Sequence, residues 1–154
     1  MKDKDSFGPR QVEAILAGLH PDGKPRWGMM TPQHIVEHLT IGVKASVGKT
    51  KPMVVSTPEQ IVQLKKQLLE SPDPWPRNMK NPLLPAEGLP ALKYGSLEEA
   101  KEKLIGAVAE FEAYYTAHPD AVQPNPFLGY LNGSDWRQFH FKHFTHHFTQ
   151  YGLL

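Results

Sequence analysis

Apolar residues recur every three to four positions in five stretches of the chain, and residues that favour turns separate these stretches. We therefore predict five helices, at residues 7–19, 31–47, 57–70, 96–117 and 132–150. The first is a short addition to four main helices. No stretch alternates apolar and polar residues convincingly with a period of two, so no strand is expected. The predicted fold class is all-α: a four-helix bundle with a long Pro-rich loop between the third and fourth predicted helices.

Capping residues indicate where the predicted helices begin. Thr31 and Thr57 each precede a proline, which is favoured at the first helical position. Ser96 stands three residues before Glu99, the spacing of a capping box. Ser134 is the expected cap of the last helix.

The Pro-rich loop spans residues 71–95 and holds six prolines. Prolines at this density prevent a regular element. Apolar residues lie between them, which predicts a loop packed on the surface rather than a free linker: Trp75, Leu83, Leu84 and Leu89. A loop of this length inside one domain is uncommon and is often functional or mobile.

The composition is that of one ordinary globular domain, residues 1–154. The formal net charge is +1, with no block of like charge, which argues against a nucleic-acid partner. The chain has no cysteine, so neither a disulfide nor a thiolate ligand can form within it. No apolar run is long enough to cross a bilayer and no signal core follows the polar N-terminus, so we expect a cytoplasmic protein without a membrane partner.

Four of the eight histidines lie in the last predicted helix, between His140 and His147. A helical projection at about 100° per residue separates two faces of this helix. The inward face holds Trp136, His140, Phe144, His147 and Tyr151, with His143 beside them and His146 on the flank. The polar face holds Gln138, Lys142, Thr145 and Thr149. His143 and His147 are four residues apart and differ by about 40°, so they face the same way.

Two explanations are open for these inward histidines. Burying several imidazoles costs free energy unless each is hydrogen-bonded or ligated. A pair at i and i+4 can hold one divalent metal, with a third ligand from another helix. Alternatively, they are core residues that bond to the backbone or to one another.

The second predicted helix carries His34 and His38, also four residues apart, with Glu37 between them. The order differs from the His-Glu-x-x-His motif of zinc proteases. His34 lies in the first turn, where the helix dipole repels a cation, so we expect a surface or supporting residue there. His38 lies one turn deeper, near the small residues Gly42 and Ala45, which would let a neighbouring helix approach. His38 is therefore the preferred third ligand.

Three stretches resemble a branch of the DinB/YfiT-like superfamily that has no assigned function. Residues 27–39 are similar to its W-G-x-M-(S/T)-x-x-x-x-x-x-H-L segment. Residues 125–131, followed by Trp136, are similar to H-P-x-F-G-x-(L/M), although Asn125 stands where the branch usually has histidine. Residues 143–152 are similar to its H-x-x-x-H-x-x-Q-x-G ending.

This resemblance implies a four-helix bundle, often a homodimer, with one divalent metal held by three histidines. Carried over by position, the implied ligands are His38, His143 and His147, and Gln150 matches a trailing glutamine that could orient a ligand. Three neutral histidines without a carboxylate suit zinc, nickel, copper or ferrous iron. Three protein ligands also leave a position for water or substrate.

The leading functional hypothesis is a metal-dependent enzyme, a thiol S-transferase or hydrolase acting on a small molecule. The superfamily includes thiol-dependent S-transferases and isomerases, so a low-molecular-weight thiol is the expected partner. Glu37 is a candidate base, and Trp27, Trp136 and Tyr151 are candidate pocket walls. None receives a catalytic role, because Glu37 projects toward the polar side of its helix and aromatics at helical spacing are usually core. The alternative hypothesis is a non-catalytic metal- or ligand-binding helical bundle, or a dimerisation module.

Overall fold

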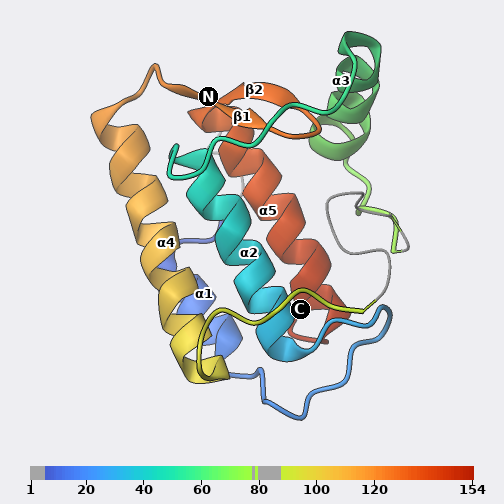
Figure 1. Ribbon diagram of the computed structural model, residues 1–154, viewed down its shortest axis with the longest axis vertical. Helices are drawn as coiled ribbons and strands as arrows, with labels where there is room; N and C mark the ends of the chain where they lie inside the picture. Colours follow the sequence, from blue (N-terminus) through green and yellow to red (C-terminus); the bar gives the residue numbers. More distant parts are fainter. Residues whose placement is uncertain (1–5, 78, 80–87) are drawn as a thin grey trace.

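The structure is a computed structural model that describes residues 6–77, 79 and 88–154. Its elements are α1 (Pro9–Leu16), α2 (Pro32–Ser46), α3 (Pro58–Lys65), the π-helical turn η1 (Lys66–Glu70), α4 (Leu97–Ala117), β1 (Val122–Asn125), β2 (Gly129–Asn132) and α5 (Gly133–Gln150). Helices α2, α4 and α5 run side by side, and α1 lies behind them (Figure 1). The β1–β2 hairpin lies at one end of these helices, beside α3.

The prediction of an all-α four-helix bundle is wrong, because the chain forms a two-stranded antiparallel sheet ahead of α5. The register runs from Val122 opposite Asn132 to Asn125 opposite Gly129. The Asn125 side chain closes the turn by accepting hydrogen bonds from the backbone N–H groups of Phe127 and Leu128 (2.9 and 3.1 Å). Each strand has only four residues, too few for a two-residue alternation to stand out in the sequence.

Most of the predicted helix starts are confirmed. The Thr31 hydroxyl accepts from the backbone N–H of His34, and the Ser96 hydroxyl accepts from that of Glu99. Thr57 and Gln60 form a capping box. Ser134 is not the cap of α5, however. Asn132, the last residue of β2, takes that role, because its extended backbone lets the side chain accept from the N–H of Asp135 at 2.9 Å.

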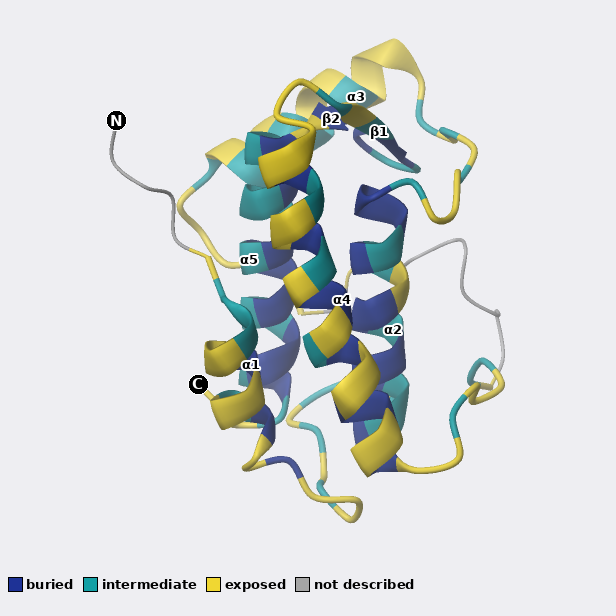
Figure 2. Cartoon of the chain, turned by 90° about the vertical axis from the view of Figure 1, so that its left-hand side faces the viewer, coloured by how far each residue is buried: buried dark blue, intermediate teal, exposed yellow. Residues whose placement is uncertain are grey.

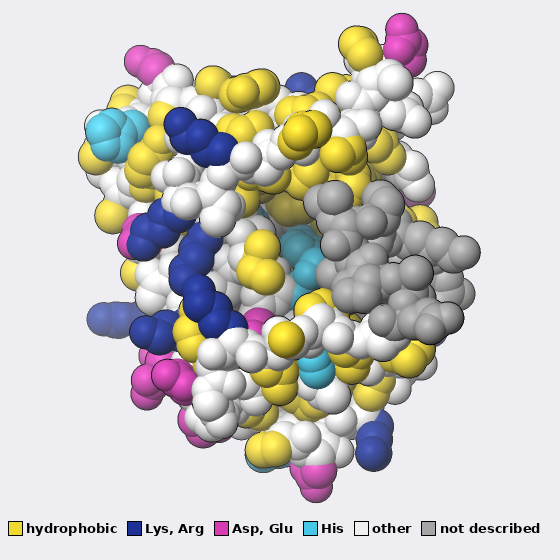
Figure 3. Space-filling view, in the orientation of Figure 1, with side chains coloured by type: hydrophobic (Ala, Val, Ile, Leu, Met, Phe, Trp, Pro, Cys, Tyr) yellow, Lys and Arg dark blue, Asp and Glu magenta, His cyan; other side chains and the backbone are white. Residues whose placement is uncertain are grey.

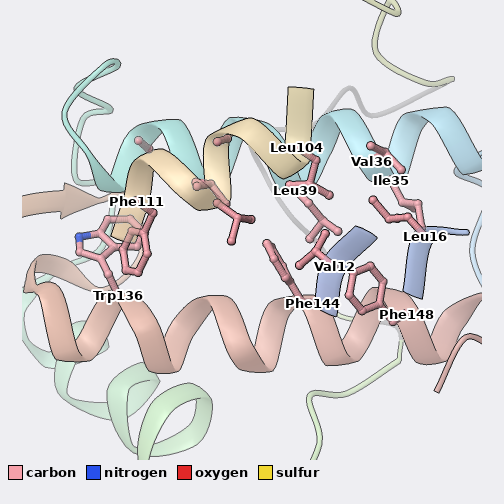
Figure 4. Close-up of a cluster of buried hydrophobic side chains, with 14 of the residues drawn as sticks. Val12, Leu16, Ile35, Val36, Leu39, Leu104, Phe111, Trp136, Phe144 and Phe148 are labelled. Atoms are coloured by element: carbon pink, nitrogen blue, oxygen red, sulfur yellow. The ribbon is translucent and has the colours of Figure 1, made fainter. Parts of the chain in front are cut away.

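The core lies between α1, α2, α4 and α5, whose buried faces turn toward one another (Figure 2). Figure 4 shows side chains from all four helices meeting there: Val12, Leu16, Leu39, Leu104, Phe144 and Phe148. Burial of each such side chain contributes roughly 1.5–3 kcal/mol. This packing fixes α2 against α5, which is what the candidate site depends on.

The two described ends of the Pro-rich loop are anchored to different helices. At the first end, Trp75 is buried and its indole N–H donates to the carbonyl of Leu68 at 3.0 Å. The Lys142 ammonium, predicted on the polar face of α5, is buried there and donates to the carbonyls of Ser71 and Asp73 (2.5 and 2.8 Å). At the second end, residues 90–94 dock on α2. The predicted packing of Leu83 and Leu84 lies outside the described residues.

Within the described part of the chain, no helix combines the length and the apolar character needed to cross a bilayer.

Candidate metal centre

Helices α2 and α5 bring His38, His143 and His147 together. Their candidate ligand nitrogens all lie within 4.8 Å of one another. The ring centroids are 4.9 Å apart for His38 and His143, 5.1 Å for His38 and His147, and 4.9 Å for His143 and His147. In the described residues this is the one group of three or more histidine or acidic side chains able to hold a metal ion. We call it the three-histidine cluster.

Gly42 of α2 lies against the ring of His143 of α5, beside the cluster. A Cβ atom at this position would lie 3.8 Å from Nδ1 of His143, in ordinary van der Waals contact. The imidazole of His143 therefore packs directly over the glycine. The two helices do approach each other here, but the spacing would also accommodate an alanine, so the approach does not require the glycine.

Burial keeps the clustered imidazoles neutral at neutral pH. Burial, and then the nearby His146, lower the pKa of His38 to about 4. Burial, and then His38, lower the pKa of His147 to about 3, although its hydrogen bond to Gln150 acts in the opposite direction. Burial and the neighbouring histidines also hold the pKa of His143 well below its usual value. A neutral imidazole keeps one nitrogen lone pair, which is what a metal requires.

A chain of hydrogen bonds orients His147. The Gln150 side-chain amide donates to the carbonyl of Trp27 at 2.8 Å, so its oxygen faces the ring of His147. Nδ1–H of His147 therefore donates to Gln150 Oε1 at 2.8 Å, and its Nε2 presents a lone pair. Gly28 makes room for this arrangement, because a Cβ atom there would lie 2.8 Å from Gln150 Nε2.

His38 and His143 meet through their Nε2 atoms, which are 3.0 Å apart. One of the two nitrogens must carry a proton for this contact to be a hydrogen bond. Nδ1 of His143 is buried and has no hydrogen-bond partner among the described residues. Each of the three imidazoles can thus turn one nitrogen toward a shared centre. Alternatively, His38 and His143 can share a proton between their Nε2 atoms.

Histidine side chains are visible at the base of a hollow on the face shown in Figure 3. Trp75 covers part of the cluster, because its ring stacks on that of His143 with centroids 5.4 Å apart. Sequence reasoning did not select Trp75 as a site residue. The available signal was that Trp75 is the one tryptophan in the Pro-rich loop.

The three aromatics that the sequence offers as pocket walls, Trp27, Trp136 and Tyr151, lie in different surroundings from one another. Trp136 is buried in the core, and its indole N–H donates to the carbonyl of Gln123 at 3.1 Å. The Tyr151 hydroxyl donates to the carbonyl of Met30. Trp27 lies near the cluster, with its ring edge-on to His146 at 5.4 Å.

Glu37 is buried, which corrects the expectation that it faces the polar side of α2. It accepts hydrogen bonds from the backbone N–H groups of Lys93 and Tyr94 (2.7 and 3.2 Å) and from the amide of Gln33 at 2.9 Å. Burial raises its pKa, but these hydrogen bonds outweigh burial and leave the pKa lowered. The carboxylate therefore anchors the loop and stays charged.

The remaining histidines of the two helices lie outside the cluster. His34 donates through Nε2 to the carbonyl of Pro90 at 2.9 Å and so also holds the loop. His140 lies 2.9 Å from the hydroxyl of Ser46, and His146 is half-buried beside Trp27.

The fold and this cluster define a class of helical domain with a β-hairpin and three converging histidines, of which His143 and His147 are buried and His38 is half-buried. Residues 19–152 match the family described as "Protein of unknown function (DUF1569)". This range covers most of the chain and all three clustered histidines, so the chain belongs to that family. No curated protein and no solved structure was found to match it.

Proposed function

We propose that the protein is a metal-dependent enzyme in which His38, His143 and His147 hold one divalent ion, zinc, nickel or iron. The observation that carries the proposal is the convergence of three ligand nitrogens within 4.8 Å, from helices that are distant in sequence. Neutral imidazoles are suitable ligands for all three metals.

The surroundings of the cluster also support this proposal. Gln150 fixes the ring nitrogen that His147 turns inward, as supporting residues do around metal ligands. Three protein ligands leave a coordination position open, which is the pattern of catalytic rather than structural sites. A divalent metal there would supply a Lewis acid that favours deprotonation of water or a thiol.

The proposed reaction is thiol S-transfer or hydrolysis on a small molecule. Its support is the resemblance of three sequence stretches to the DinB/YfiT-like superfamily, which is an argument from analogy. A low-molecular-weight thiol as partner, a homodimer and a cytoplasmic location belong to the same proposal.

Metal analysis of the full chain, purified without a histidine tag, tests the ion first. We expect about one metal per chain and a lower melting temperature after chelation. His38→Ala should lose most of the metal and remain folded, whereas the exposed His118→Ala should keep it as the matched control. Metal content far below one per chain with unchanged melting after chelation would refute the proposal, as would equal metal in His38→Ala. If metal is present, a panel of thiols and electrophilic substrates tests the reaction.

One observation favours a second candidate, a non-catalytic module. The 3.0 Å contact between Nε2 of His38 and Nε2 of His143 lets these two histidines satisfy each other without an ion. In that case the histidines would be a hydrogen-bonded part of the core. The same metal analysis distinguishes a metal centre from such a metal-free core, and the panel of thiols and electrophilic substrates distinguishes an enzyme from a non-catalytic metal-binding module.

A further inference from the structure

Three lysine side chains gather around one tyrosine beside the hollow. The ammonium group of Lys44 lies 3.3 Å from the hydroxyl of Tyr94. Those of Lys93 and Lys103 lie 5.6 and 5.9 Å from the centroid of the Tyr94 ring. We call these four residues the lysine–tyrosine group. It brings positive charge from α2, α4 and the end of the Pro-rich loop to one place.

No carboxylate in the described residues pairs with these three ammonium groups. The ion pairs formed there are Lys49–Glu110 and Lys101–Glu98. The nearby carboxylate of Glu37 is directed at backbone N–H groups, and that of Glu99 accepts from the N–H of Gly95 at 2.8 Å. The lysine–tyrosine group therefore keeps donors for an anion, since each ammonium has three and a tyrosine hydroxyl has one.

The position of the group relative to the three-histidine cluster follows from the register of α2. Lys44 is six residues after His38, which is about 9 Å along the helix axis. Ile41 lies between them and is 64 % exposed, an apolar surface at the middle of this path. Figure 3 shows Lys and Arg side chains in a column beside the hollow, with a hydrophobic side chain between them and the histidines. Anion-binding donors, apolar surface and candidate metal ligands thus follow one another across a single face.

We propose that the small molecule bound at this hollow carries a carboxylate or phosphate group, held by Lys44 and the Tyr94 hydroxyl. The apolar part of this molecule lies over Ile41, and its other end is directed at the three-histidine cluster. This last part of the inference rests on the proposed metal centre. Lys93 and Lys103 add to the positive potential that attracts the anion. Both anions accept charge-assisted hydrogen bonds from an ammonium group.

Small aromatic probes test this inference without the reaction. The full chain is treated with a chelator, so that a carboxylate cannot bind a metal, and titrated with benzoate, phenyl phosphate or the neutral benzamide. Amide chemical shifts report the binding position. Benzoate or phenyl phosphate should shift the signals of Ile41, Lys44 and Tyr94, and the tighter of the two identifies the preferred anion. Benzamide should bind at least about fivefold more weakly, because it lacks the charge.

Two variants locate the contact. Lys44→Met keeps the apolar stem and should weaken anion binding about fivefold or more, whereas Lys24→Met, on an exposed loop, should not change it. Equal binding of benzamide and benzoate, or unchanged affinity in Lys44→Met, would overturn the inference. Anion binding at Lys44 in a chain that takes up no metal would support this inference and refute only the proposed metal centre.

Discussion

Buried imidazoles occur at two places along α5, and they differ in what their nitrogens meet. His140 and His147 are equally buried, with 7 % and 8 % of their surface exposed. Burial is the first cause of a pKa lowered to about 3 at both. Around His140 the partners are the Ser46 hydroxyl, at 2.9 Å, and the stacked ring of Trp136. Around His147 they are three further imidazoles and Gln150.

Neither burial nor a depressed pKa therefore separates a structural histidine from a candidate ligand in this protein. What separates them is the partner that α2 supplies at each level of α5. Toward the hairpin, α2 ends in Ser46, a hydroxyl that can satisfy one nitrogen. About one to two turns farther along α5, at His143 and His147, α2 presents His38, whose own lone pair can join that of His143. The same residue type is thus a core residue at one level and a candidate ligand at the other.

The same substitution should reduce metal affinity at the level of His143 and leave it unchanged at the level of His140. His143→Phe removes a candidate ligand, and we expect its metal affinity to fall by more than the roughly 10- to 100-fold that loss of a supporting hydrogen bond costs. His140→Phe keeps a ring of similar size and leaves Ser46 bonded to the carbonyl of Val43, so its affinity should be unchanged. Calorimetric metal titration of both variants measures the difference. Similar losses in both would mean that the two levels of α5 are not distinct.

Acid should destabilise the metal-free protein partly through His140. Its pKa is about 3 in the folded chain and about 6.5 when unfolded, so it is neutral in both states above pH 6.5. Below pH 6.5 the unfolded chain binds a proton that the folded chain cannot, and stability falls by up to about 1.4 kcal/mol per pH unit for this residue. His140→Phe lacks this contribution. Denaturant unfolding at pH 7 to pH 5 should show that the free energy of unfolding declines less steeply in His140→Phe than in the wild type. Parallel declines in the two proteins would show that His140 does not remain neutral.

The sequence indicated the helices and the candidate ligands because both depend on local spacing. Thr31 with Pro32 starts α2, and the four-residue interval in α5 places His143 and His147 on one face. The burial of Glu37 could not be predicted in the same way. Its partners, Lys93 and Tyr94, are 56 and 57 residues away, in a loop with no periodic pattern.

The partners of His140 and His143 could not be predicted from local spacing. Both project inward from α5, and only the packing of α2 decides which of them meets Ser46 and which meets His38. The hairpin was missed for a different reason. Two strands of four residues, one of them containing Pro124, carry too few positions for a periodic signal.

The hydrogen bonds of Gln150 provide a finer test of the cluster, because they act on one ligand without removing it. Gln150→Leu takes away the acceptor that holds the proton on Nδ1 of His147. We expect metal affinity to fall roughly 10- to 100-fold, less than for loss of a ligand. In the metal-free chain, nitrogen chemical shifts of His147 should change from a single Nδ1–H form to a mixture of tautomers.

Gly28→Ala should act in the same direction as Gln150→Leu, since its Cβ atom would displace Gln150 Nε2 and its φ of +80° is unfavourable for alanine. The matched control is Gly106→Ala, where a Cβ atom would meet nothing within 4 Å. A wild-type tautomer in Gln150→Leu would mean that the cluster itself, rather than Gln150 and the Trp27 carbonyl, orients His147.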